Sequence, residues 1–133
     1  MCEIAINVGL LQEYSEVDIS GTAAGFVKLA GRLVKNSTGI FSLTLKRNAY
    51  FPVTISEVSL ELVDQSEGLI DAQIHGTELK ISGDSRAFQK LAAFLESLSC
   101  VPPGGHFHLD WFSDEDLLAP TTSTMSFIFS VER

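Results

Sequence analysis

The stretch Glu78-Leu-Lys-Ile-Ser-Gly-Asp-Ser-Arg-Ala-Phe-Gln-Lys-Leu-Ala-Ala-Phe-Leu95 sets the fold expected of this chain, because an earlier stretch repeats it. Sixty-two positions upstream stands Glu16-Val-Asp-Ile-Ser-Gly-Thr-Ala-Ala-Gly-Phe-Val-Lys-Leu-Ala-Gly-Arg-Leu33, and nine of the eighteen aligned pairs are identical. Ordinary composition gives roughly one such identity. The match predicts an internal duplication, with copies over about 2–64 and 69–132 of a single domain spanning 1–133.

Both stretches begin with a short alternation of polar and apolar residues. Val17 and Ile19 share one face in the first copy, and Leu79 and Ile81 share one face in the second. Alternation with a period of two is typical of a strand that is buried on one side only. Each copy is therefore expected to open with a half-buried strand that ends at Ser-Gly.

After Ser-Gly the spacing of apolar residues changes to that of a helix. The two apolar stripes are Phe26, Leu29, Ala30, Leu33 and Val34, and Ala87, Phe88, Leu91, Ala92, Leu95 and Leu98. Thr22 is placed to cap the first helix, and Asp84 or Ser85 to cap the second. The turn-forming segments 36–39 and 102–105 are expected to end the two helices.

The remaining pattern predicts an α+β fold with eight strands. The expected strands cover about 2–8, 16–20, 40–46, 57–63, 69–75, 78–82, 105–112 and 123–131. Because nearly every strand alternates, only one face of the sheet should be buried. We therefore expect two tandem, diverged β-α-β-β units that form one largely antiparallel sheet, with both helices on one face, water on the other and a pseudo-two-fold axis between the halves.

Composition narrows the class of partner. The chain has 133 residues, 45% of them hydrophobic, which is enough for one core, and its formal net charge is −8. The basic residues are scattered singly along the sequence, so nucleic acid is a poor candidate partner, whereas a cationic protein would be attracted.

The first residues resemble no signal peptide and no apolar run is long enough to span a membrane, so a cytoplasmic location is expected.

No motif for catalysis is recognisable. There is no GxSxG elbow, and Cys100 follows the second expected helix, where the negative end of the helix dipole disfavours a thiolate. Cys2 and Cys100 form no CxxC pattern and are expected to be free thiols. The chain is therefore predicted not to be an enzyme and to need no cofactor.

A row of polar residues on one strand raises a metal-site alternative. His106, His108 and Asp110 are spaced by two and project from one face, and His75 is placed on another strand that could share this face. The positions that alternate with the row are apolar and should face the core: Phe107, Leu109 and Trp111. A plain polar sheet face is therefore the favoured interpretation, and no metal is assigned.

The segment Asp110-Trp-Phe-Ser-Asp-Glu-Asp116 places four carboxylates beside two aromatic residues. It lacks the D-x-[DN]-x-[DN]-G pattern of an EF-hand calcium loop. A solvated loop is the ordinary interpretation of such a segment. A recognition patch is the alternative, with Trp111 and Phe112 as anchors, although alternation points Trp111 toward the core.

The open face of the expected single sheet is the larger candidate surface. By alternation it presents Glu16, Asp18, Ser42, Thr44, Glu57, Ser59, Glu61, Asp71, Gln73, His75, Glu78, His106, His108 and Asp110. This face is acidic and broad enough for a protein partner. From it and the adjoining loop we select the predicted partner-binding residues: Glu57, Glu61, His106, His108, Asp110, Trp111, Asp114, Glu115 and Asp116.

Several motifs of the second copy carry a family resemblance. The run 79–84, then Phe88 and Leu91-Ala92, then the run 105–110 resemble immunity protein family thirty-two of bacterial polymorphic toxin systems, mainly over residues 78–131. The resemblance implies a non-enzymatic antidote that binds and blocks a cognate protein toxin. The first copy departs from the pattern, with Ile40 and Ser42 in place of the two histidines. A self-associating structural domain, such as a homodimer, and a metal-binding protein are the alternatives.

Overall fold

The computed structural model describes residues 4–10, 14–35, 38–43, 45 and 51–132. Its helices and strands, in chain order, are β1 (Ile4–Leu10), β2 (Ser15–Thr22), α1 (Ala23–Val34), β3 (Gly39–Ser42), β4 (Val53–Ile55), β5 (Glu57–Leu62), β6 (Asp71–His75), β7 (Glu78–Gly83), α2 (Ser85–Ser97), η1 (Leu98–Cys100), β8 (His106–Asp110), η2 (Pro120–Thr122) and β9 (Met125–Glu132). The α+β class is confirmed. Each of the two expected helices forms.

The strands form two sheets, so the prediction of one sheet is wrong. A five-stranded sheet has the order β4-β1-β2-β9-β8, and a four-stranded sheet has the order β3-β5-β7-β6. Each sheet is mixed, because β2 pairs with β9 and β5 pairs with β7 in parallel, while the other pairs are antiparallel. Alternation reports only that one face of a strand is buried. Two sheets that face each other satisfy this pattern as well as one sheet beneath helices does.

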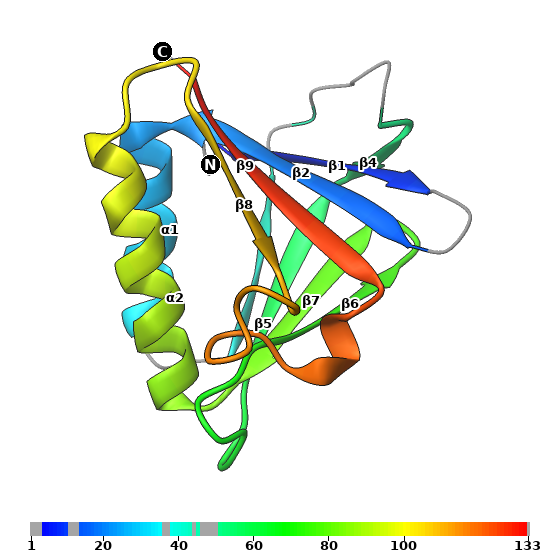
Figure 1. The fold of residues 1–133 in the computed structure, drawn as a ribbon, viewed down its shortest axis with the longest axis vertical. Coiled ribbons are helices and arrows are strands. Elements are labelled where there is room, and N and C mark those ends of the chain that lie inside the picture. The colour runs from blue at the N-terminus through cyan, green and yellow to red at the C-terminus, as the bar shows by residue number, and fades with distance from the viewer. Residues whose placement is uncertain (1–3, 11–13, 36–37, 44, 46–50, 133) are drawn as a thin grey trace.

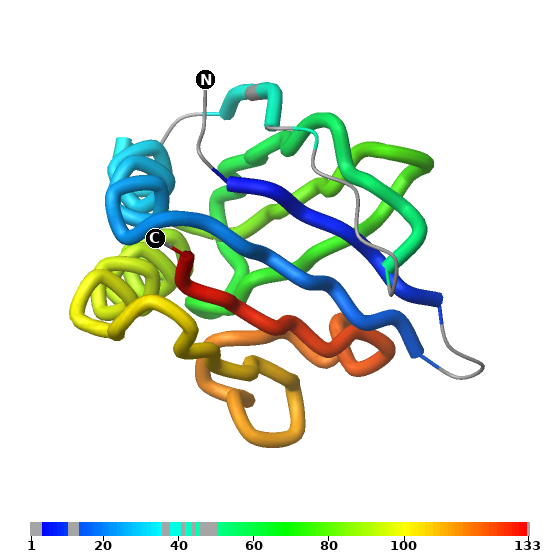
Figure 2. Tube along the Cα trace, turned by 90° about the horizontal axis from the view of Figure 1, so that it is seen from above, coloured from blue at the N-terminus to red at the C-terminus, as the bar shows by residue number. Residues whose placement is uncertain are grey.

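The two sheets enclose one core together with the helices (Figures 1 and 2). Figure 2 shows the sheets facing each other, with α1 and α2 side by side along one margin. The largest fully buried side chains include Phe26 from α1 and Phe88 from α2. The parallel pairs place strands from both halves of the chain in each sheet, so the core is shared between the halves.

Both helices begin with the expected side-chain caps. The backbone N–H of Gly25 donates to the Thr22 hydroxyl oxygen over 3.0 Å, and the N–H of Ala87 donates to Asp84 Oδ1 over 2.8 Å. Gly83, just before the second cap, is buried, and a Cβ there would stand 2.9 Å from the Cβ of Ala87. The Ser-Gly step is therefore a tight turn from strand to helix, as its sequence indicates.

Asp84 also fastens the loop before β6 to the start of α2. Its Oδ2 accepts backbone N–H groups from Ser66 at 3.0 Å and Gly68 at 3.1 Å, in addition to the cap on Ala87. These backbone donors lower the pKa of Asp84 to about 2, because each stabilises the carboxylate over the protonated acid. The cap predicted for one helix therefore also holds a distant loop.

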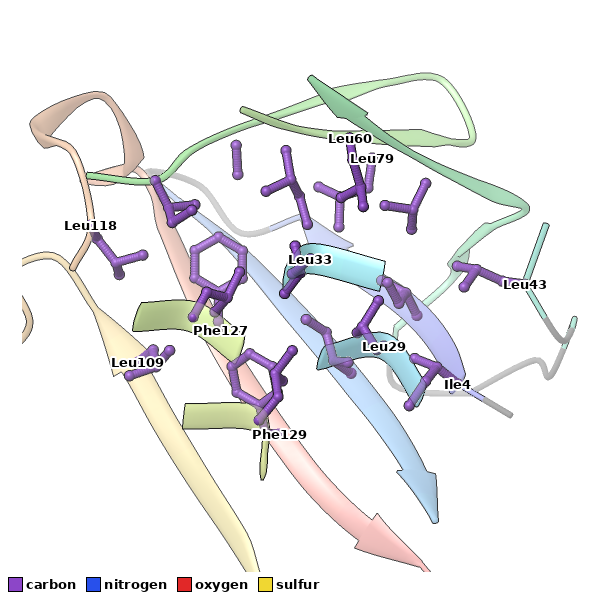
Figure 3. A pocket seen from close by; sticks show the side chains of 18 residues that line it. Ile4, Leu29, Leu33, Leu43, Leu60, Leu79, Leu109, Leu118, Phe127 and Phe129 are labelled. Atoms are coloured by element: carbon purple, nitrogen blue, oxygen red, sulfur yellow. The ribbon is translucent and has the colours of Figure 1, made fainter. Parts of the chain in front are cut away.

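An apolar cavity of about 50 Å³ lies in the core between the two sheets and the helices (Figure 3). Side chains from every layer line it, among them Leu33 on α1, Leu79 on β7 and Phe127 on β9. All of its lining residues are apolar, so it has no polar group to orient a ligand or hold a water. We regard it as a packing gap where the layers meet.

Some boundaries differ from the predictions. The strand expected over 105–112 ends at Asp110, because the chain turns there, and β4 is an additional strand. The first strand extends to Leu10, while its expected start at residue 2 lies outside the described residues, as do residues 44 and 46 of the third expected strand.

The charges separate by layer. Of the six basic residues in the described part of the chain, five lie on α1, at its C-cap or on α2: Lys28, Arg32, Lys35, Arg86 and Lys90. The sixth, Lys80, lies on β7. The basic residues that are scattered along the sequence thus lie mainly on the helices, and the charged side chains on the outer faces of the sheets are mainly acidic. No helix among the described residues has the length and apolar character that crossing a membrane requires.

Candidate interaction surface

The predicted partner-binding residues do not share one face. Glu57 and Glu61 lie on β5 in the four-stranded sheet, whereas His106, His108 and Asp110 lie on β8 at the edge of the five-stranded sheet. The remaining predicted residues lie in the loop after β8: Trp111, Asp114, Glu115 and Asp116. Because the outer faces belong to different sheets on opposite sides of the core, the single broad surface that we expected does not exist.

The outer face of the five-stranded sheet is only partly open. One row across it runs Thr54, Asn7, Asp18, Ile128 and His108 from strand to strand. Asn7 is 2% exposed and Asp18 is 9% exposed, and the Thr54 hydroxyl donates to Asn7 Oδ1 over 2.9 Å. The expectation that Asp18 meets water is wrong. Access to this face is concentrated at β8.

The outer face of the four-stranded sheet is polar and half-exposed, and its carboxylates contact neighbouring side chains. Lys80 Nζ lies 3.0 Å from Glu61 Oε2, and the Ser59 hydroxyl donates to Glu78 Oε1 over 3.0 Å. Glu57 stands opposite Glu78 in the parallel ladder. Much of the negative charge here is thus engaged within the sheet itself.

The loop after β8 is held by its own carboxylates. Asp110 Oδ1 accepts the N–H of Ser113 over 3.0 Å, and Asp114 Oδ2 accepts the N–H of Asp110 over 3.1 Å. The backbone carbonyl of Asp114 then accepts N–H groups from Leu117 at 3.0 Å and Leu118 at 2.9 Å. Two of the four carboxylates in this acidic segment therefore define the shape of the loop.

The two aromatic residues of this loop have different roles. Trp111 is partly buried and packs against the core, whereas Phe112 is 73% exposed, with its ring centroid 5.1 Å from that of Trp111. Glu115 and Asp116 are exposed beside them, and Lys90 on α2 donates to the backbone carbonyl of Asp116 over 2.6 Å. We call this surface the β8-end patch: Asp110, Trp111, Phe112, Asp114, Glu115 and Asp116.

β8 itself is an edge strand with an unusual exposed aromatic residue. Phe107 lies on the core-facing side, as predicted, yet it is 47% exposed, whereas Leu109 on the same side of β8 is buried. The N–H of Val131 donates to the carbonyl of Gly105 over 2.9 Å. In an antiparallel ladder every second residue bonds to the neighbouring strand, so Gly105, Phe107 and Leu109 direct their backbone groups toward β9. The N–H and carbonyl groups of His106 and His108 therefore point away from β9, toward the free edge.

The histidines do not assemble a metal site with the other predicted ligands. The rings of His106 and His108 are 5.6 Å apart between centroids, but His75 lies on β6 of the other sheet, with Nε2 3.1 Å from Gln73 Oε1. In the ranges that the structure describes, no three His, Cys, Asp or Glu side chains are grouped to hold a metal ion. Cys100 is an exposed free thiol, and Cys2 lies outside the described residues.

Trp111 packs against the core, as its place in the alternation indicated, and Phe112 is the exposed aromatic residue of the loop. The selected partner-binding residues included Trp111 but not Phe112, although the alternation breaks at Phe112. A second feature was missed from the sequence. Lys90 supports the loop from α2, twenty-six positions away in the sequence. No local pattern reports such a contact.

Comparison with known proteins agrees with the resemblance over part of the chain. The model of the family described as Immunity protein 32 matches residues 78–129. This segment runs from the start of β7 to Phe129 and contains α2, β8 and the whole β8-end patch, but neither Glu57 nor Glu61. No curated protein and no solved structure matches the chain.

Proposed function

We propose that this protein is a non-enzymatic, cytoplasmic antidote of the immunity type that binds a cognate bacterial toxin through the β8-end patch. The observation that carries the proposal is the 73% exposed Phe112, held on a hydrogen-bonded loop inside the segment that matches the immunity family. A solvent-exposed aromatic side chain on a loop that is held by hydrogen bonds is typical of a binding anchor, because little conformational entropy is lost when a partner covers it.

The charge around the anchor supports a cationic protein as the partner. Glu115 and Asp116 are exposed beside Phe112, and the chain carries a formal net charge of −8. Such a surface accelerates the encounter with a basic protein and repels nucleic acid. Toxins that cleave nucleic acids need cationic surfaces for their substrates, so a toxin of that chemistry fits the patch.

Each residue of the patch has a distinct role in the proposal. Phe112 is the anchor, Trp111 supports it from the core side, and Asp110 and Asp114 shape the loop. His106 and His108 border the patch on β8. Glu57 and Glu61, on the other sheet, act only through the long-range field.

The internal duplication is a second part of the proposal. The strand order β1-β2-β9-β8 in one sheet has the same form as β6-β7-β5-β3 in the other, with α1 after β2 and α2 after β7. This correspondence supports two copies related by a pseudo-two-fold axis. Only the second copy carries the β8-end patch, which would confine recognition to one half.

Rescue from toxicity tests the function directly. The tagged protein is used to capture partners from a lysate of its own cells, and the C-terminal domain of any captured secreted protein is expressed alone in a host. Expression of a true toxin domain arrests growth, and co-expression of the wild-type protein restores it. Calorimetry with an inactive toxin variant should then show tight binding at one-to-one stoichiometry.

A matched pair of variants locates the surface. Phe112→Ala should lose rescue, whereas Ile40→Ala, which truncates a similarly exposed apolar side chain on the other sheet, should keep it. Rescue by neither or by both variants would place recognition elsewhere. A stable symmetric dimer with no toxin partner would instead favour a self-associating structural domain.

A further inference from the structure

We infer that the partner adds an extended strand to the free edge of β8, so that the five-stranded sheet continues into the bound protein. The expected partner is a protein that presents a segment in β conformation carrying lysine or arginine. The biological identity of that partner rests on the proposed function, whereas the edge itself is a property of this chain.

The backbone of β8 is arranged for such an addition. His106 and His108 direct their N–H and carbonyl groups away from β9, which offers up to four main-chain hydrogen bonds to a new strand. Both side chains and that of Phe107 between them are exposed. Backbone bonds of this kind give affinity, and the alternating side chains give specificity.

The loop after β8 limits the available edge to these residues. The N–H of Asp110 already donates to Asp114, and the carbonyl of Asp110 accepts from Ser113 and Asp114. These bonds satisfy the outward backbone N–H and carbonyl groups at the end of the strand. If they were unpaired, the longer open edge could pair non-specifically with strands of other proteins. An added strand therefore meets β8 at 106–108 and then reaches the β8-end patch.

The other sheet edges are less suited to a partner. The edge beside β6 is partly covered by the chain before η2, because Ile70 donates to the carbonyl of Leu117 and accepts from Ala119, each over 2.8 Å. The described parts of β3 and β4 are four and three residues long. The edge at β8 joins outward backbone groups to the exposed aromatic side chain of Phe107.

The surroundings of the edge select the chemistry of the strand. Glu115 and Asp116 are exposed at the end of β8, so basic side chains at one end of the added segment would be attracted. Phe107 presents an apolar, half-covered ring on the core-facing side, which favours an apolar side chain opposite it. The expected segment is thus short, extended and basic, with an apolar residue near its middle.

A proline substitution at His108 separates backbone pairing from side-chain contact. Because the N–H of His108 points to the free edge, His108→Pro removes one outward donor while leaving the ladder to β9 intact. His108→Ala removes only the side chain. Phe107→Pro would break the ladder to β9 and serves as the destabilised comparison, so thermal unfolding should be normal for the first two variants only.

The first probe is a disulfide-closed hairpin peptide of alternating lysine and valine with an Asn-Gly turn, so that an apolar side chain can lie opposite Phe107, and the control replaces lysine by glutamate. With the lysine hairpin at millimolar concentration, hydrogen exchange of the backbone amides of His106 and His108 in the wild type should slow at least about tenfold. The amide of His106 should slow similarly in His108→Ala but not in His108→Pro. Unchanged exchange, or equal protection by the glutamate hairpin, overturns the inference.

The second probe is the inactive toxin domain, and it distinguishes the two proposals. His108→Pro should weaken toxin binding at least about tenfold relative to His108→Ala. If the wild type binds the toxin and the two variants bind equally, the strand inference fails while the proposed function stands. If the hairpin protects the edge but no toxin is bound, the proposed function fails and the edge remains a site for basic strands.

Discussion

The β8-end patch and the outer face of the four-stranded sheet are both rich in carboxylates, yet their structures differ. On the sheet face, Glu61 contacts Lys80 and Glu78 accepts from Ser59, so side chains satisfy one another. In the β8-end patch, Asp110 and Asp114 bind backbone N–H groups of their own loop.

The difference shows why an acidic composition is insufficient to define a binding site. Carboxylates on a sheet are held by the ladder and pair with neighbours, which makes a solvated surface. Carboxylates that bind a turn shape the segment between them, which here contains the exposed Phe112. The patch thus combines an exposed aromatic side chain with acidic neighbours, and this combination is typical of interface centres.

The largest expected effect is the loss of binding affinity when the exposed aromatic residue of the β8-end patch is truncated. Phe112→Ala should weaken binding of the toxin domain by about 2 kcal/mol or more, roughly thirtyfold, because hot-spot aromatics lose that much on truncation. Ile40→Ala is the matched control, since Ile40 is 66% exposed on the other sheet. Calorimetry gives both affinities, and an equal loss in the two variants would contradict a dominant patch.

The next effect concerns the loop itself. Asp114→Ala removes the acceptor of the Asp110 N–H and should lower the free energy of unfolding by about 1–2 kcal/mol, as expected for a hydrogen bond to a charged group. Glu115→Ala, one position away and exposed, should leave stability nearly unchanged. Urea unfolding measures both, and similar midpoints for the two variants would mean that the loop is not held by this carboxylate.

Asp84 extends the comparison to a carboxylate whose role is a helix cap. Its folded pKa is about 2 and its ordinary value 3.8, so its stabilising contribution is complete above about pH 4 and is lost as the pH falls toward 2. Asp84→Asn should therefore have a lower unfolding temperature than the wild type at pH 5, with the gap narrowing toward pH 2. A gap that is constant with pH would show that the carboxylate charge is not the stabilising feature.

The smallest effect separates charge near the anchor from charge far from it. The double change Glu115→Gln, Asp116→Asn should slow toxin association about three- to tenfold at low salt, because these groups flank the contact. Glu57→Gln, Glu61→Gln removes the same charge from the other sheet and should slow it by less than about twofold. Stopped-flow rates at two salt concentrations compare them, and equal slowing would indicate steering by net charge alone.

Much of the local structure could be predicted because local patterns cause it. The helices follow from apolar residues at helical spacing, and Thr22 and Asp84 cap them as expected. Alternation identified the core-facing side of the strands, but the expectation that only this side is buried is wrong for β1, where Ile4 to Gly9 are buried on both faces. The predicted turn at Ser-Gly is explained by Gly83, where a side chain would meet Ala87.

The arrangement of the site could not be predicted in the same way. Whether His106 and Glu57 share a surface depends on which strands pair, and β2 with β9 and β5 with β7 pair across long separations in the sequence. Phe107 is 47% exposed while Leu109, on the same side of the same strand, is buried. Neither property alters the alternation of residues along a strand.

The sequence by itself determined both helices and most of the strands, the acidic character, the family resemblance of residues 78–129 and the presence of aromatic residues beside carboxylates. Only the tertiary structure decided that there are two sheets, that Asp18 is buried, and that β8 has a free edge. The physical reason is the separation in sequence over which each interaction acts. Helix caps and alternation act over a few residues, whereas strand pairing and burial depend on contacts between distant parts of the chain.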